Sequence, residues 1–362
     1  MGNEMSFEEL QEILGACVDE VVNLRKENDV LKQDMKQLMG LIQTVVASQK
    51  DMVNKSEEIT NSIYRLSEIC QRSINNLPYE NGDPRSVREF WYPKFHSLEH
   101  TIDMLVNQRC SMARYGDGEF AIMSGERRHK FQSIDARLVS RLGEVLHSSD
   151  EGFLVGIADN YGDLSQYNAE GKRGIRYYMT DDVREKHRTF LELDKTYHNA
   201  YISRPYAMWA DNGTDAPRRR FAELQRIWDG RDVIFVEGDL TRMGVGNDLF
   251  QNAKSIRRII GPATNAFGKY DRILSACLKH ASKDTLFLIA LGPTAGVLAY
   301  DLFKKGYQAV DIGHVDLEYE WMKNGTGGRS EVKTKYNNEY QDGDKVEDIH
   351  DAEYEKQIIA RV

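Results

Sequence analysis

Apolar residues recur every seven positions from Phe7 to Cys70. One set, at the heptad positions designated d, comprises Leu10, Cys17, Leu24, Leu31, Leu38, Val45, Met52, Ile59 and Leu66. The other set, at the positions designated a, comprises Phe7, Leu14, Val21, Asn28, Met35, Ile42, Gln49, Ser56, Ile63 and Cys70. A seven-residue repeat sustained over this length predicts a left-handed coiled coil, because only supercoiling keeps such a seam facing its partner.

Polar residues interrupt this seam at several a positions. Asn28 lies between Leu24 and Leu31, where a buried pair of amides fixes the register of a parallel dimer and lowers its stability. Gln49 and Ser56 weaken the seam further along, or mark solvated layers of it. We expect self-association through a parallel coiled coil with a dimer favoured, while isoleucines in the seam leave a trimer or tetramer open.

Two prolines and a glycine follow the heptad repeat, in the segment Asn75-Asn76-Leu77-Pro78-Tyr79-Glu80-Asn81-Gly82-Asp83-Pro84. Residues of these types predict that the helix ends here. The expected organisation is therefore a coiled-coil oligomerisation stalk over residues 1–76, a linker over 77–86, a second domain over 87–345 and a C-terminal tail over 346–362.

The pattern changes after Ser86, where apolar runs of strand length alternate with segments of helical periodicity. This alternation predicts an α/β fold with a Rossmann-like, largely parallel sheet. The expected strands are residues 111–115, 153–157, 232–236, 255–260, 285–291 and 308–312. Helices are expected over 134–146, 267–281 and 294–304, and residues 163–230 are expected to be mostly helical, with a break at 201–206.

Ligands of such sheets bind outside the carboxyl ends of the strands, which directs attention to the residues after each apolar run. The first run is followed by Gly116-Asp117-Gly118-Glu119. Asp117 and Glu119 can offer oxygens to one hard divalent cation, and the glycines allow the backbone to bend closely enough. Asp-Gly is also a common turn dipeptide in which the carboxylate bonds only the local backbone.

Glycines follow two of the later runs. Gly244-Val245-Gly246-Asn247 and Gly292-Pro293-Thr294 each expose backbone N–H groups before a helix, which is how a phosphate can be bound without a lysine-bearing loop. The first segment lacks the third glycine of the dinucleotide fingerprint, and it is not a Walker A motif. The second is equally consistent with a helix cap and close packing of strand and helix.

The last run leads into Asp311-Ile312-Gly313-His314-Val315-Asp316-Leu317-Glu318-Tyr319-Glu320-Trp321. Four carboxylates, a histidine and two aromatic residues are too many polar groups for a packed core. The cluster suits a general base, a metal contact and an aromatic platform for a sugar ring. Surface solvation explains single carboxylates such as Asp311 or Glu320 equally well.

Composition and charge exclude several classes of function. The chain has 362 residues, of which 41% are hydrophobic and 29% charged, as in water-soluble globular proteins. A net charge of −9 argues against nonspecific nucleic-acid binding. The four cysteines match no metal-binding or disulfide spacing, and no apolar run is long enough for an integral membrane segment, so we expect a cytoplasmic protein.

Several of these stretches together resemble the bacterial glycosyltransferases of the GT-D fold, a former domain of unknown function that transfers glucose during the glycosylation of serine-rich adhesins. The resemblance rests on motifs in the expected order from about residue 90 to 340: Arg114 to Glu119, Ser203-Arg204-Pro205-Tyr206, Gly244 to Phe250, Leu291 to Ala295 and Gly313 to Trp321. The coiled coil is an addition to this catalytic domain.

The resemblance implies metal-dependent transfer of a hexose, with UDP-glucose as the expected donor and a glycan, glycoprotein or surface polymer as acceptor. It also implies Mn²⁺, or Mg²⁺, at Asp117 and Glu119. Arg114 or Arg204, with the glycine segments, would bind phosphate or ribose. If the reaction inverts the anomeric centre, Asp316 or Glu318 would be the base, with Glu237 as the next choice.

Two other functions fit the same residues. A nucleotide-sugar or sugar-phosphate hydrolase could use the same carboxylates with water as acceptor. A non-catalytic coiled-coil scaffold could bind a nucleotide-linked ligand without turnover.

Overall fold

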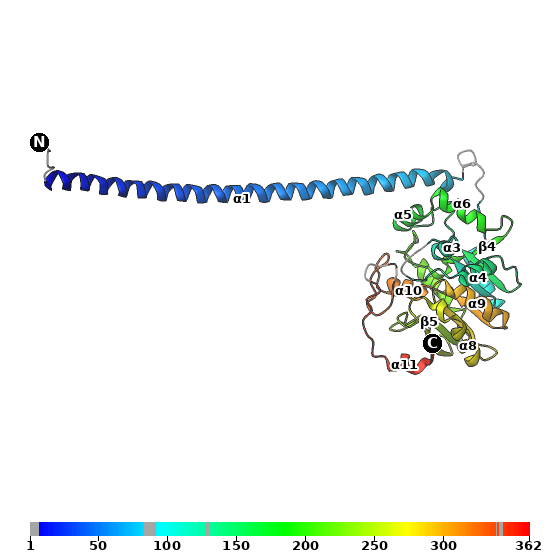
Figure 1. Ribbon diagram of the computed structural model, residues 1–362. Helices are drawn as coiled ribbons and strands as arrows, with labels where there is room; N and C mark the ends of the chain where they lie inside the picture. The colour runs from blue at the N-terminus through cyan, green and yellow to red at the C-terminus, as the bar shows by residue number, and fades with distance from the viewer. Residues whose placement is uncertain (1–6, 83–91, 127–130, 338, 340–342) are drawn as a thin grey trace. The chain divides into compact units, whose positions relative to one another are not determined.

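Helix α1 runs from Phe7 to Glu80 as one continuous α-helix of 74 residues (Figure 1). The protein is described by a computed structural model over residues 7–82, 92–126, 131–337, 339 and 343–362. At 1.5 Å per residue α1 is about 110 Å long. The chain divides into two compact units, residues 1–70 and 71–362. No helix in the described part of the chain is long and apolar enough to cross a membrane.

The seam predicted for α1 is exposed in the isolated chain. Leu24, Leu31 and Leu38 are 58%, 61% and 59% exposed, and the other large apolar side chains of the seam are exposed as well. Exposed apolar surface of this extent normally marks an interaction site.

The C-terminal turns of α1 belong to the second unit. Asn76 is buried, and its Oδ1 accepts a hydrogen bond of 2.8 Å from Nη2 of Arg184, which is also buried. The guanidinium of Arg184 lies 3.9 Å from the ring centre of Tyr79. Arg176 forms an ion pair with Glu80 at 2.7 Å. These contacts keep the chain helical through Pro78, although proline removes a helical N–H.

The expected boundary at residue 76 is therefore displaced. Residues 77–80, which the prolines predict to be linker, are helical and packed, and part of the expected linker, residues 83–86, lies outside the described residues.

The second unit is built on a nine-stranded sheet in the order β1-β4-β3-β2-β8-β7-β5-β6-β9, and its strands pair in parallel. The strands are β1 (Lys94–Phe95), β2 (Ser111–Tyr115), β3 (Phe153–Ile157), β4 (Thr196–Asn199), β5 (Asp232–Gly238), β6 (Ser255–Gly261), β7 (Leu286–Ala290), β8 (Gln308–Asp311) and β9 (Ile358–Arg361). The α/β fold with a largely parallel sheet is thus confirmed.

Helices cover both faces of this sheet (Figure 1). They are α2 (Leu98–Asn107), α3 (Asp117–Met123), α4 (Ala136–Leu146), α5 (Ala169–Tyr178), α6 (Asp181–Phe190), α7 (Ala216–Gln225), α8 (Tyr270–His280), α9 (Thr294–Lys304), α10 (Val315–Lys323) and α11 (Ala352–Gln357), with 3-10 turns at Ala200–Ser203 and Ala266–Lys269.

Alternate residues of the central strands enter two different cores, because successive side chains of a strand point to opposite faces. Ile234 and Val236 pack in the core that contains α4 and α9. Val233 and Phe235 pack in the core that contains α2, α7 and the apolar side of α10. Burial on both faces explains the nearly continuous apolar runs in the sequence.

Three strands, β1, β4 and β9, are not predicted by the pattern of apolar residues. β1 and β4 are short and polar and lie at one side of the sheet, and β9 closes the other side. β9 falls in residues 346–362, which the sequence suggests to be a tail. This segment is instead part of the domain, since β9 pairs with β6 and the buried Tyr354 lies 4.9 Å from the guanidinium of Arg258.

A stack of histidines lies beside β4. The ring of His96 lies 4.6 Å from that of His100 and 4.6 Å from that of His198. His198 is buried, and its Nδ1 lies 3.0 Å from Oγ1 of Thr101. Burial, together with the charges of His96 and His100, lowers the pKa of His198 to about 3. The imidazole is therefore neutral in the folded protein at neutral pH.

Replacement of Asn76 tests the packing of the helix end. Asn76→Ala removes the partner of a buried guanidinium, and the second unit should lose about 1–3 kcal/mol of unfolding free energy, measured by urea denaturation. The neighbouring Asn75 is exposed, so Asn75→Ala is the matched control and should change this free energy little. Equal effects of both substitutions would contradict the packing of residues 71–80 on α5 and α6.

The histidine stack predicts acid sensitivity. The unfolded chain binds a proton at the His198 position near pH 6.5, whereas the folded protein does so only near pH 3, so stability falls as the pH drops below 6.5. Between pH 7 and 5 this loss should be about 2 kcal/mol. His198→Asn should flatten the dependence in urea denaturation, whereas His350→Asn, at an exposed position, should leave it intact.

Candidate active site

The carboxyl ends of β2, β3, β4, β7 and β8 surround a cavity of about 640 Å³. β2 lies between β3 and β8, where the order of strands along the chain changes direction. A change of direction of this kind opens a crevice between the loops, and ligands of parallel sheets bind there. The cavity thus lies at the edge of the sheet predicted from the sequence.

Asp117 and Glu119 lie in the wall of this cavity, in the first turn of α3. The sequence suggests a turn at this point, but the chain enters a helix directly, with Gly116 at its N-cap. Glu119 is half-buried, and its Oε2 accepts a hydrogen bond of 2.8 Å from the backbone N–H of Gly116. Asp117 is exposed to the cavity. Glu119 therefore stabilises the helix start, and Asp117 is the more accessible carboxylate.

Glu119 lies among other carboxylates and has a shifted pKa. Burial raises the pKa of Glu119 to about 7, and the negative charges of Asp311 and Asp117 add to the rise. Within the described residues, no group of three or more His, Cys, Asp or Glu side chains could hold a metal ion by itself. Two carboxylates fit a magnesium-like ion that takes its remaining ligands from water and substrate phosphates. The residues present therefore fit a divalent cation that binds together with a phosphorylated ligand.

Arg114, at the end of β2, links neighbouring elements beneath the cavity. Its Nη2 donates to Oδ1 of Asp311 at 2.6 Å, and its Nη1 donates to Oγ of Ser203 at 2.6 Å. Gly313 has a φ of 47°, and a Cβ at this position would lie 2.0 Å from Nη2 of Arg114. The positive φ therefore favours glycine here, and a side chain would also displace the guanidinium packed against this position.

The segment after β7 lies in the cavity wall at Gly292 and Pro293, where α9 begins. Gly292 has a φ of 53°, and a Cβ there would lie 2.0 Å from the ring of Phe131. Thr294 is buried behind it. The N-terminal end of an eleven-residue helix thus faces the cavity and offers a partial positive charge.

The other glycine segment, Gly244-Val245-Gly246-Asn247, is not part of the cavity wall, among the residues described. The side chain of Asn247 donates to Asp316 and Glu320, both at 2.7 Å. These hydrogen bonds hold α10 in place from outside the described cavity lining. Glu237 is likewise absent from the described lining of the cavity and is fully buried, with an ion pair of 2.5 Å to Arg258.

The candidate bases on α10 have different surroundings. Asp316 lies in the cavity wall, and its Oδ2 accepts from Nζ of the buried Lys335 at 2.7 Å. Lys335 also bonds Glu320 at 2.9 Å. Glu318 is buried and accepts the backbone N–H groups of Tyr206 and Ala207, at 3.0 and 2.7 Å. Both residues are buried, and of the two Asp316 belongs to the described lining of the cavity.

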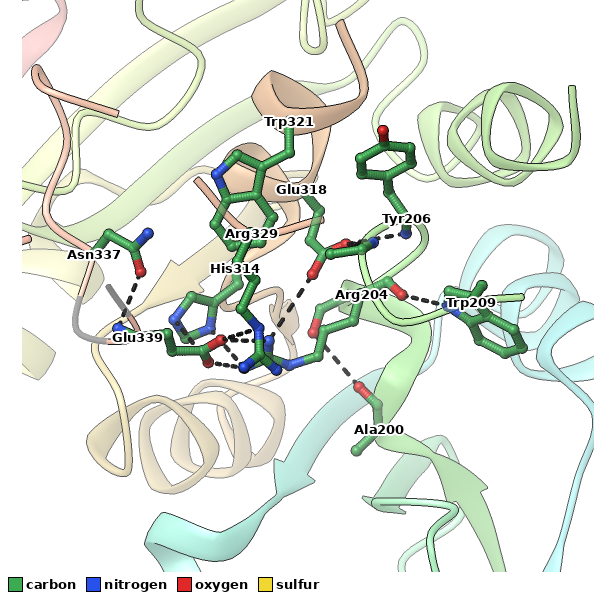
Figure 2. Close-up of polar contacts among 12 residues, drawn as sticks. Ala200, Arg204, Tyr206, Trp209, His314, Glu318, Trp321, Arg329, Asn337 and Glu339 are labelled. Atoms are coloured by element: carbon green, nitrogen blue, oxygen red, sulfur yellow. Dashed lines mark hydrogen bonds and ion pairs between the residues drawn. The ribbon is translucent and has the colours of Figure 1, made fainter. Parts of the chain in front are cut away.

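A cluster of charged side chains closes another side of the cavity (Figure 2). Glu339 accepts hydrogen bonds from both terminal nitrogens of Arg204, and Nε of Arg329 lies 3.2 Å from its Oε2. Nε2 of His314 lies 3.6 Å from its Oε1. Burial would raise the pKa of Glu339, but the charges of Arg204, His314 and Arg329 lower it well below its usual range.

Arg204 of this cluster is among the residues predicted from the sequence, whereas Glu339 and Arg329 are not. Both come from the irregular segment after α10, where no periodicity or motif distinguishes them from surface charges. The aromatic wall formed by Tyr178 and Tyr201 is also not predicted from the sequence.

Comparison with known proteins decides the family. The model of the glycosyltransferase GT-D fold matches residues 112–340, which include Asp117, Arg204 and Glu339. This chain belongs to the GT-D glycosyltransferase family. Helix α1 precedes the matched residues.

Solved structures of related domains have the same fold. A glycosyltransferase from Streptococcus sanguinis, with domain of unknown function 1792, superposes with a TM-score of 0.70 at 34% identity, covering 75% of this chain and all of that one. Another domain of this kind, described as having a distinct glycosyltransferase fold, gives a TM-score of 0.69 at 33% identity, covering 74% of this chain and 95% of that one.

Longer streptococcal proteins contain a similar segment. The chain is 35% identical over 298 residues to a probable glycosyl transferase, Gly, of Streptococcus gordonii, covering 82% of this chain and 42% of that protein. It is 36% identical over 270 residues to the glycosyltransferase GlyD of Streptococcus pneumoniae serotype 4, covering 73% of this chain and 32% of that protein. The GT-D chain thus spans less than half the length of these relatives.

Proposed function

We propose that this protein transfers a hexose from a nucleotide-sugar donor, with UDP-glucose expected, to a hydroxyl of a glycan or glycoprotein in a reaction that needs Mn²⁺ or Mg²⁺. One observation carries the proposal: Asp117 and Glu119 share a cavity with the N-terminus of α9 and with the guanidinium groups of Arg204 and Arg329. Carboxylates for a cation and donors for phosphate oxygens are the parts that a nucleoside diphosphate leaving group requires.

Each wall of the cavity has a part in donor binding. Asp117 and Glu119 would hold the ion, which neutralises charge on the departing diphosphate. The first backbone N–H groups of α9 orient a phosphate by their partial positive charge. Arg204 and Arg329 can each donate to phosphate oxygens, in competition with Glu339. Arg114 contributes indirectly, because its bonds to Asp311 and Ser203 fix the cavity floor.

The proton of the acceptor hydroxyl would pass to a carboxylate in the cavity. Asp316 is our candidate because it is part of the cavity wall, although it is buried, whereas Glu318 and Glu237 are absent from the described lining and are bonded to backbone N–H groups and to Arg258. Lys335 and Asn247 hold the Asp316 carboxylate in place. A base held in a fixed position can take the proton as the new glycosidic bond forms.

We also propose that residues 7–70 self-associate through their exposed apolar seam. Several catalytic units joined in this way would raise the effective concentration of active sites on an acceptor with many hydroxyl groups.

Asp117→Ala tests the cation site. The variant should lose about 100-fold or more in kcat/KM for release of UDP from UDP-glucose with acceptor and Mn²⁺ present, because charge on the leaving group is no longer neutralised. Mn²⁺ binding in the presence of UDP, measured by the electron paramagnetic resonance signal of free Mn²⁺, should weaken in parallel. Asp194→Ala, at an exposed position, is the control.

Wild-type turnover and Mn²⁺ binding in Asp117→Ala would refute the assignment. A donor screen that follows release of UDP, GDP and TDP by mass spectrometry extends the test. Fast release without acceptor would indicate a hydrolase, and no release from any donor would indicate a scaffold.

A pair of substitutions tests the base. Asp316→Asn should lower kcat by roughly 100-fold or more while Mn²⁺ and UDP still bind, because the proton acceptor is lost. Glu237→Gln should instead lower the unfolding free energy by roughly 3 kcal/mol, because it leaves the buried Arg258 without its counter-charge. Initial rates and urea denaturation separate the two effects. Unchanged kcat in Asp316→Asn would exclude it as the base.

A further inference from the structure

We propose that residues 7–70 bind a second copy of this chain as a parallel coiled coil with zero stagger, so that each seam residue faces its own counterpart. This inference rests on the self-association proposed above and assigns a register to the parallel pairing expected from the sequence. The occupant is identified by the seam itself, which carries polar residues, charges and cysteines at positions that fit another copy of the same helix.

The polar seam residues exclude an antiparallel pairing. In an antiparallel coiled coil the a positions of one helix face the d positions of the other, and here the d positions contain only Leu, Val, Met, Ile and Cys. Asn28, Gln49 and Ser56 would each be buried against a side chain without a matching hydrogen-bonding group. Burying such polar groups unpaired is costly. A parallel pairing places a positions against a positions and avoids this cost.

The same residues select one register among the parallel pairings. Asn28, Gln49 and Ser56 are separated by unequal intervals along the seam, so any stagger by whole heptads pairs at most two of them. A stagger of one heptad, for example, joins Gln49 to the partner's Ser56 but leaves Asn28 against Met35 of the partner subunit. With zero stagger each of the three polar side chains faces the same residue of the partner helix.

Charges beside the seam favour the same arrangement. In parallel coiled coils a g residue contacts the e residue of the following heptad on the partner. Here Glu20 faces the partner's Arg25, and Glu27 faces the partner's Lys32. Further along the helix, Leu41 faces the partner's Val46. The g and e residues of all three pairs are exposed in the isolated chain. Opposite charges at both ionic pairs add specificity to the polar layers.

Two seam cysteines make the register measurable. Cys17 occupies a d position and Cys70 an a position, and both are exposed, whereas Cys110 and Cys277 are buried. With zero stagger each exposed cysteine faces its counterpart. In the antiparallel pairing that brings these cysteines together, Cys17 would face Cys70 of the partner subunit. The two arrangements therefore give different disulfides.

The experiment uses the full chain, oxidised briefly with copper phenanthroline, and its variants Cys17→Ser, Cys70→Ser and the double variant. In the zero-stagger arrangement each single variant still forms a covalent dimer on a non-reducing gel, and the double variant forms none. Loss of the covalent dimer in both single variants, when the unsubstituted chain forms it, would show the antiparallel arrangement and would overturn the proposal. Absence of the covalent dimer from the unsubstituted chain would show a staggered arrangement and would also overturn it. A monomer in analytical ultracentrifugation would overturn it as well.

Charge exchange provides a second, independent test. A chain with Glu20→Lys and Glu27→Lys, and another with Arg25→Glu and Lys32→Glu, should each self-associate about 10-fold more weakly than the parent. An equimolar mixture should restore association as a heteromer, and failure to do so would contradict the parallel pairing. UDP release measured on the same samples separates this outcome from the catalytic proposal, since the substituted residues lie outside the catalytic unit.

Discussion

The adjacency of β2 and β8 is the constraint on which the candidate active site depends. These strands are far apart in sequence, yet they pair at Met112 and Val310 and carry Asp117 and Asp311 to the same edge. The ion pair of 2.6 Å between Arg114 and Asp311 crosses this junction. A charge pair buried here is stabilised further because the guanidinium also donates to Ser203 Oγ and to the Asp311 carbonyl.

Buried ionic groups around the cavity serve mainly to hold its walls. Glu237 with Arg258, Glu318 with backbone N–H groups, and Lys335 with Asp316 each satisfy a charge that would be costly to bury alone. These pairs join β5 to β6 and α10 to the segments on either side of it. Asp316 has both roles, because Lys335 holds it in the wall where it is the proposed base.

Helix α1 differs from the second unit in what stabilises its apolar side chains. Its first sixty or so residues bury nothing within the chain, so its apolar seam is stabilised by association rather than by the fold. Its last turns behave in the opposite way, because Asn76 and Tyr79 complete the surroundings of the buried Arg184. One helix thus belongs to both units, and α5, which it contacts through Arg176, contributes Gly174 and Tyr178 to the cavity wall.

The sequence by itself determined the heptad seam, the main strands, the sheet edge at which the cavity lies, and the position of Asp117 and Glu119 at that edge, because periodicity and strand ends are local properties of the chain. Only the tertiary structure decided that Asp316 is part of the cavity wall while Glu318 and Glu237 lie outside the described lining, since partners distant in sequence fix the place of each buried carboxylate. The same holds for Glu339, for β9 and for the helix beyond Pro78. Their roles depend on long-range contacts, which leave no periodic signal along the chain.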